Sequence, residues 1–195
     1  MIVLLAILLG YFIYRDVFPK FILSEENYKE YWEIRQWLIP HFLGALAALL
    51  IGPIQLTKSI RTNHYQLHRN LGRIYVGSIL IASTMAFKLA IESSCQTCIP
   101  PLIILSILWF IVTLLAFYFA RHGHFEIHQQ FMIRSYVLTF AFVIIRTLGP
   151  VLDPLEFFQN LDSAEDRRAI REWLTWVIPL LITESWFIWT NQVKR

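Results

Sequence analysis

The sequence predicts an all-α integral membrane protein, folded as a bundle of about six transmembrane helices. Two observations predict this class. The chain of 195 residues is 56% hydrophobic and only 16% charged, whereas soluble domains are about 25% charged. Its apolar residues also form long stretches with few charges, and about 20 apolar residues are enough to cross the hydrocarbon core of a bilayer. The lipid bilayer is therefore the first partner that the sequence predicts.

Six apolar stretches are candidate spans, and together they predict a single membrane domain over residues 1–195. The stretches cover about 1–18, 38–57, 74–91, 99–120, 132–151 and 173–191. Aromatic or basic residues lie near the ends of each stretch, as is typical of headgroup belts. The first stretch also has the length of a signal peptide, but a basic start and a small-residue cleavage site are missing. We expect it to be retained. The charged and aromatic segment 24–36 predicts a short interfacial helix.

Lysine and arginine predict the orientation of these spans. They gather after the second span, after the fourth span and at the chain's end, and an even number of crossings separates these three places. Because positive loops stay in the cytoplasm, the pattern predicts cytoplasmic N and C termini. Other membrane subunits are candidate partners, and nothing in the sequence indicates binding to nucleic acid. The basic residues concerned are Lys58, Arg61, Arg69, Arg73, Arg121, Arg134, Lys194 and Arg195.

Histidines are concentrated in the two inner loops. Two pairs are four residues apart, His64 with His68 and His124 with His128, and His122 lies beside the second pair. Residues four apart share a helix face, and two imidazoles placed in this way can bind one metal ion. The alternative is that these histidines are mildly cationic residues of the interface.

The two inner loops also share an order of residues. Each gives His, then Arg, then Tyr on the way into the next span: His68, Arg73 and Tyr75 in one, His128, Arg134 and Tyr136 in the other. If the two hairpins are a repeat, His68 and His128 lie near each other at the inner interface. Both histidines precede the apolar stretches by about five residues, near 1.5 Å each. An interfacial metal or quinone headgroup then fits better than a buried haem, unless the helices begin earlier than hydropathy indicates. Arginine and tyrosine also suit an interface without any further role.

Ionisable residues inside the spans are candidates for function by default. His41 and Arg146 lie near the outer ends of their spans and are candidates for an outer polar site that holds an anionic headgroup or a quinone carbonyl. Glu184 lies well inside the sixth span. Gln55 is at a comparable depth, so the two predict an intramembrane polar pair that either holds the bundle together or handles protons.

Cys95 and Cys98 form a C-x-x-C pattern in the loop assigned to the outside. An oxidising compartment favours a disulfide at this spacing. Thiol exchange of the thioredoxin kind is disfavoured because the sequence lacks the βαβ context of that fold. A local disulfide on a tight turn is the expected role.

Four motifs support a resemblance to a known family. They are His41-Phe-Leu-Gly44, Gly52-Pro-Ile-Gln55, His68-Arg-x-x-Gly72-Arg-x-Tyr75 and His128-x-x-Phe-Met132-x-Arg134-Ser-Tyr136. The chain resembles, over about 41–150, a bacterial family of predicted multi-pass membrane proteins named as a domain of unknown function, number 2306. Phe131 stands where the resemblance leads us to expect Trp. The resemblance implies a helical bundle in a bacterial inner membrane, and favours His41, His68 and His128 over the remaining histidines.

Two functions from different classes follow as expectations. Because the sequence has no complete catalytic constellation, it favours a non-catalytic accessory, scaffold or small-solute membrane component, and no catalytic residue is assigned. The alternative is a small membrane redox component that binds haem, a metal ion or quinone. In that case His68 and His128 are candidate metal ligands, and His41, Arg134 and Arg146 are further candidate cofactor contacts.

Overall fold

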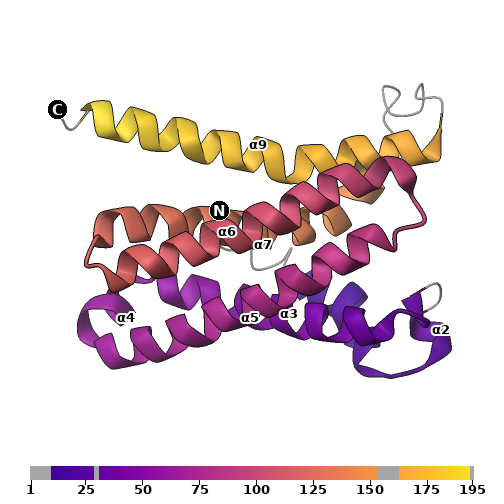
Figure 1. Ribbon diagram of the computed structural model, residues 1–195, viewed down its shortest axis with the longest axis horizontal. Helices are drawn as coiled ribbons and strands as arrows, with labels where there is room; N and C mark the ends of the chain where they lie inside the picture. Colours follow the sequence, from indigo (N-terminus) through magenta and orange to yellow (C-terminus); the bar gives the residue numbers. More distant parts are fainter. Residues whose placement is uncertain (1–9, 29–30, 153–162, 194–195) are drawn as a thin grey trace.

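The computed structural model describes residues 10–28, 31–152 and 163–193, and in these ranges the chain is helical with short connections and no strand. The predicted all-α class is confirmed (Figure 1). In chain order the elements are η1 (Ile13–Val17), η2 (Phe18–Phe21), α2 (Glu25–Tyr28), α3 (Arg35–Leu56), α4 (Lys58–Asn63), α5 (Tyr65–Ile91), η4 (Gln96–Cys98), α6 (Ile99–Arg121), α7 (Phe125–Leu152) and α9 (Ala164–Val193).

Four helices among the described residues are long and apolar enough to cross a membrane. They are the regions Arg35–Leu56, Tyr65–Ile91, Gln96–Arg121 and Phe125–Thr147, which match the second to fifth predicted spans. Residues 1–9 of the first predicted span lie outside the described ranges. The sixth falls within α9, which has 30 residues but is less apolar, since it contains Glu184 and several Trp, Thr and Ser residues. The count of six spans thus stays a prediction.

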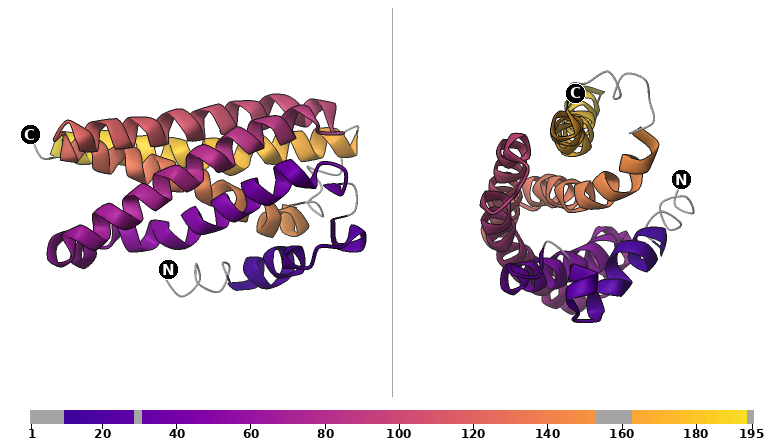
Figure 2. Two further views of the ribbon diagram at one scale, coloured as in Figure 1. Left: turned by 60° about the horizontal axis from the view of Figure 1, so that its bottom comes forward. Right: turned by 90° about the vertical axis from the view of Figure 1, so that its right-hand side faces the viewer.

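The four apolar helices close into a bundle. Helix α3 packs along α5, α5 on α6, α6 on α7, and α7 touches α3 again. Because short connections reverse the chain each time, α5 and α7 run in the same direction. Helix α9 packs on α7, α6 and the turn η4, on the side of the molecule away from the N-terminal helices (Figure 2).

Small residues bring α3 close to its neighbours. Gly44, Ala48 and Gly52 are four residues apart, so they share one face of the helix. A Cβ atom at Gly44 would lie 2.6 Å from the carbonyl oxygen of Ser78 on α5, and one at Gly52 would lie 2.2 Å from the ring of Tyr136 on α7. Such small-residue stripes let membrane helices approach closely.

Two helices begin earlier than hydropathy predicts. Helix α5 starts at Tyr65 rather than near 74, and α7 starts at Phe125 rather than near 132. Their first turns are polar, so a hydropathy pattern reads them as loop. The backbone N–H groups of His68 and His128 nevertheless donate to carbonyls four residues earlier, at 3.0 and 2.9 Å. Both histidines are therefore helical.

The predicted interfacial helix over 24–36 is wrong in its extent. Among the described residues of this segment, the α-helix covers Glu25–Tyr28, residues 32–34 are a bend and turn, and α3 begins at Arg35. Tyr28 is buried, and its hydroxyl donates to the carbonyl of Lys20 at 2.7 Å. Such a contact folds the segment back on itself in place of a continuous helix.

Candidate functional site

A cluster of polar side chains lies inside the bundle where α5, α6 and α7 meet. The hydroxyls of Tyr75 and Ser135 are 3.1 Å apart, and those of Thr113 and Ser135 are 2.7 Å apart. The indole N–H of Trp109 donates to Thr139 Oγ1 at 3.0 Å, and that hydroxyl donates to the carbonyl of Ser135 at 2.8 Å. We call these five residues the central polar cluster. All five are buried, and their partners all come from the protein itself.

Two histidines lie near the N-terminal ends of α5 and α7. His68 precedes Tyr75 by seven residues and His128 precedes Ser135 by seven, which is about two helical turns. Because α5 and α7 run in the same direction and touch at Tyr75 and Ser135, the two imidazoles lie on the facing sides of the helices. They are close enough to interact electrostatically. We call His68 and His128 the inner imidazole pair.

The hydrogen bonds of this pair are incomplete. His128 Nδ1 lies 2.8 Å from the carbonyl oxygen of Ala116, and since a carbonyl only accepts, this nitrogen carries the proton. Its Nε2 then keeps a lone pair. The Nδ1 atom of His68 is buried without a hydrogen-bond partner. Each imidazole therefore retains a nitrogen that can bind a ligand.

Gln55 and Glu184 do not form the predicted intramembrane pair. Gln55 is buried and donates from Nε2 to the carbonyl of His68 at 3.1 Å. Glu184 instead binds Arg134, with Nε to Oε1 at 2.5 Å and Nη2 to Oε2 at 2.8 Å. The prediction paired these two residues because they lie at similar depths along their helices. Gln55 is on α3, which packs on α5 and α7, whereas Glu184 is on α9, which packs on α6 and α7.

The Arg134–Glu184 ion pair fixes α9 to α7. The guanidinium of Arg134 also lies over the rings of Phe131 and Phe187, 5.1 and 4.7 Å from their centroids. A bidentate ion pair flanked by aromatic rings is a favourable way to hold two charges at low dielectric. Arg134, a sequence candidate for cofactor contact, is thus engaged with a protein carboxylate.

The outer candidates are joined by an aromatic ring. His41 is buried, and its Nδ1 lies 2.9 Å from the carbonyl oxygen of Ala82. Its ring meets those of Trp109 and Phe142 edge-on, at 6.4 and 5.7 Å. The guanidinium of Arg146 lies 5.5 Å from the centroid of Phe142. His41 and Arg146 therefore both contact the ring of Phe142.

The remaining histidines of the inner loops lie on the surface. His64, His122 and His124 are exposed, and His122 Nδ1 is bonded to the carbonyl of Tyr118 at 2.8 Å. Among the described residues, no three His, Cys, Asp or Glu side chains gather as metal ligands would. Any metal in the described part of the chain would thus take at most two protein ligands of these types.

Cys95 and Cys98 form a disulfide between α5 and α6. Both cysteines are buried and pack against Ala169 of α9 and Leu102 of α6. Their burial keeps the sulfurs away from solvent, which suits a structural link rather than thiol exchange.

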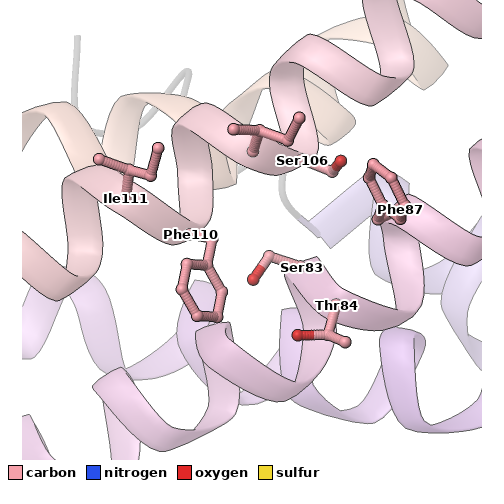
Figure 3. A pocket seen from close by; sticks show the side chains of 7 residues that line it. Ser83, Thr84, Phe87, Ser106, Phe110 and Ile111 are labelled. Atoms are coloured by element: carbon pink, nitrogen blue, oxygen red, sulfur yellow. The ribbon is translucent and has the colours of Figure 1, made fainter.

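A pocket of about 360 Å³ opens between α5 and α6 (Figure 3). Its lining is apolar, with Phe87 and Phe110 at its edges. The hydroxyls of Ser83, Thr84 and Ser106 donate to carbonyls of their own helices, at 2.7, 2.8 and 2.8 Å. They are therefore not free to hold a polar ligand, and this pocket does not carry the chemistry of the site.

Comparisons with known proteins give a family and no activity. No curated protein and no solved structure matches the chain significantly. A family model described as "Predicted membrane protein (DUF2306)" matches residues 38–187, which include the inner imidazole pair, the central polar cluster and both partners of the Arg134–Glu184 ion pair. The resemblance read from the motifs is confirmed over a longer range than 41–150, and the chain belongs to this family of predicted membrane proteins.

Proposed function

We propose that the protein is a small membrane redox component whose inner imidazole pair, His68 and His128, binds a metal centre. The observation that carries the proposal is the pair of ring nitrogens left without protein partners at the inner ends of two parallel helices. A histidine that ligates a metal typically donates its other ring N–H to a carbonyl. The bond from His128 Nδ1 to the carbonyl of Ala116 has this form.

Haem iron is the form of metal that fits this donor set best. A structural zinc ion takes four protein ligands and a catalytic one takes three, and the described residues offer two imidazoles without a third such group. A haem iron needs only axial ligands from the protein, because the macrocycle supplies the others. The early start of α5 and α7 also removes the objection that both histidines lie in loops, since each projects from a helix.

The test is elemental analysis together with an absorption spectrum of the untagged protein in mild detergent. The proposal predicts about one iron per chain and a haem spectrum that changes on reduction. Both signals should be lost in His68→Ala and in His128→Ala. His122→Ala is the matched control, because this exposed histidine is bonded only to its own helix.

Two results would contradict the proposal. One is a folded protein that carries no metal. The other is a double variant, His68→Ala with His128→Ala, that keeps the metal content of the wild-type protein. If the protein binds zinc or copper in place of iron, and the same variants lose that metal, the assignment of the imidazole site is retained. The assignment of haem is then wrong.

A non-catalytic role as scaffold, accessory subunit or small-solute component is the second candidate. The observation in its favour is that the central polar cluster and the Arg134–Glu184 ion pair are satisfied within the chain. Under this function, His68→Ala changes only folding yield and no cofactor is purified with the protein.

We further propose six spans in one domain, with both termini cytoplasmic in an inner (plasma) membrane. The basic residues of α4 and of the start of α5, together with Arg121 at the end of α6, support this orientation, since such residues stay in the cytoplasm. Cysteine accessibility to a membrane-impermeant reagent tests it. His64→Cys and His124→Cys should react only from the cytoplasmic side.

A further inference from the structure

Two polar side chains on α9 are buried without complete hydrogen bonding. Glu172 and Trp176 are each only 5% exposed. The Oε2 atom of Glu172 and the indole nitrogen Nε1 of Trp176 have no hydrogen-bond partner. One is an acceptor and the other a donor. Because the residues are four apart, their side chains project from the same face of the helix, one turn from each other.

This face of α9 packs against two other parts of the chain, α6 and the disulfide turn. Trp176 packs into the main core with Trp109 of α6, and its ring is 5.4 Å from that of Trp173. Ala169, one turn before Glu172, packs against the disulfide of Cys95 and Cys98. The two unsatisfied atoms therefore lie in an aromatic-lined junction of α6, α9 and the disulfide turn.

The charges nearby restrict the kind of ligand. Arg146, Arg168 and Arg171 all lie within electrostatic range of the Glu172 carboxylate. Arg168 Nε lies 3.8 Å from Oε1, which is too long for a hydrogen bond, and Oε2 has no hydrogen-bond partner. Because three arginines already surround this carboxylate, an uncharged hydrogen-bond donor suits Oε2 better than a further cation.

We propose that Glu172 and Trp176 bind the hydroxyl of a phenolic headgroup, of the hydroquinone type, from a molecule dissolved in the membrane. One hydroxyl completes both groups, because it donates to Glu172 Oε2 and accepts from Trp176 Nε1. The aromatic rings of Trp109, Trp173 and Trp176 give a flat apolar ring favourable contacts. A water molecule satisfies the same two atoms without using these rings. The site is separate from the inner imidazole pair and does not depend on the function proposed for it.

The test measures equilibrium binding of a short-chain hydroquinone to the purified full-length protein in detergent. Its dimethyl ether is the matched probe, since it has the same ring and can accept but cannot donate. We expect one hydroquinone per chain and at least tenfold weaker binding of the ether. Glu172→Gln should weaken hydroquinone binding at least tenfold, because a neutral amide oxygen is a weaker acceptor than a carboxylate, and Trp176→Phe should weaken it several-fold, because the indole donor is lost. Glu165→Gln, an exposed change on the same helix, should leave it unchanged.

Other results would overturn the proposal. Equal affinity for hydroquinone and ether, or an unchanged affinity in Glu172→Gln, would show that the hydroxyl is not recognised there. Absence of binding by both probes would mean that the buried atoms hold only water. His68→Ala should retain hydroquinone binding, so loss of the inner site and loss of this one are distinguishable. If Glu172→Gln does not fold, Trp176→Phe and the ether decide the outcome.

Discussion

The inner imidazole pair and the central polar cluster lie on the same two helices, two turns apart, and differ in how their polar atoms are satisfied. At Tyr75 and Ser135 the hydroxyls bond to each other, and Thr113 completes the group. At His68 and His128, one ring nitrogen is buried without a partner and another keeps a free lone pair. Both pairs lie on α5 and α7, but only Tyr75 and Ser135 are joined by a hydrogen bond across the two helices.

This difference separates a structural contact from a candidate binding site. A buried polar group without a hydrogen-bond partner lowers the stability of the folded protein. Such a group is therefore a candidate for binding a ligand. Gln55 contributes to holding the incomplete pair in position, since it donates to the carbonyl of His68. The comparison therefore predicts that mutations in the satisfied contacts reduce stability, whereas mutations in the imidazole pair reduce ligand binding.

The largest effect on stability is expected at the Arg134–Glu184 ion pair. Arg134→Ala leaves the half-exposed Glu184 carboxylate without its bidentate partner, and since a hydrogen bond to a charged group contributes about 1.5–3 kcal/mol, we expect a loss of about 3 kcal/mol. Unfolding in a denaturing detergent measures the loss.

The matched control for this change removes both charges. Arg134→Leu together with Glu184→Leu should recover much of the stability, because no charge is then left unpaired. A double variant as unstable as Arg134→Ala would show that packing rather than charge pairing dominates this contact.

A smaller loss is expected in the central polar cluster. Ser135→Ala removes the hydroxyl that both Tyr75 and Thr113 contact, and the unsatisfied groups should cost about 1–3 kcal/mol. The same detergent titration measures it. Ser59→Ala, an exposed change on α4, should stay within about 0.5 kcal/mol of the wild-type protein. If Ser135→Ala lowered the stability as little as Ser59→Ala does, the central polar cluster would not be a stabilising contact.

Gly52→Ala tests how closely α3 packs on α7. The added methyl would lie 2.2 Å from the Tyr136 ring, so the ring or the helix has to move, at a cost of about 1–3 kcal/mol. Gly77→Ala is the control, because no atom lies within 4 Å of the position of its Cβ. In a helix interior that change should be neutral or stabilise by about 0.5–1 kcal/mol. In thermal unfolding, Gly52→Ala should lower the melting temperature, whereas Gly77→Ala should leave it unchanged or raise it.

The smallest effect on the stability of the ligand-free protein is expected at His68. His68→Ala removes no hydrogen bond of the imidazole, because Nδ1 has none, so the stability should change by about 0.5 kcal/mol or less. A loss as large as that of Ser135→Ala would mean that the imidazole supports the fold rather than a ligand.

Apolar stretches were enough to predict the four helices of the bundle. Hydropathy missed the first turns of α5 and α7, because their polar residues resemble those of loops, although the backbone bonds of His68 and His128 continue the helix. The shared order of residues in the two inner loops was the better guide, since it predicted that these two histidines lie near each other.

Partners across the bundle were harder to predict. Glu184 was matched with Gln55 because both lie at a similar depth, but depth does not indicate which helices are neighbours. The central polar cluster was not predicted, because Ser, Thr and Tyr are common in apolar spans and a single such residue does not indicate a cluster. The four-residue spacing of Thr139 from Ser135, and of Thr113 from Trp109, is the signal that was available. The two unpartnered atoms on Glu172 and Trp176 had no sequence signal, because they follow from tertiary packing.

The most direct test of the account is the metal content per folded chain of His68→Ala compared with Tyr75→Phe. Both changes lie on one face of α5, seven residues apart. The account predicts that Tyr75→Phe lowers the melting temperature and keeps the metal of the wild-type protein, whereas His68→Ala loses the metal. Equal metal content in the two variants, or its absence from the folded wild-type protein, would contradict the assignment of the inner imidazole pair as a metal site.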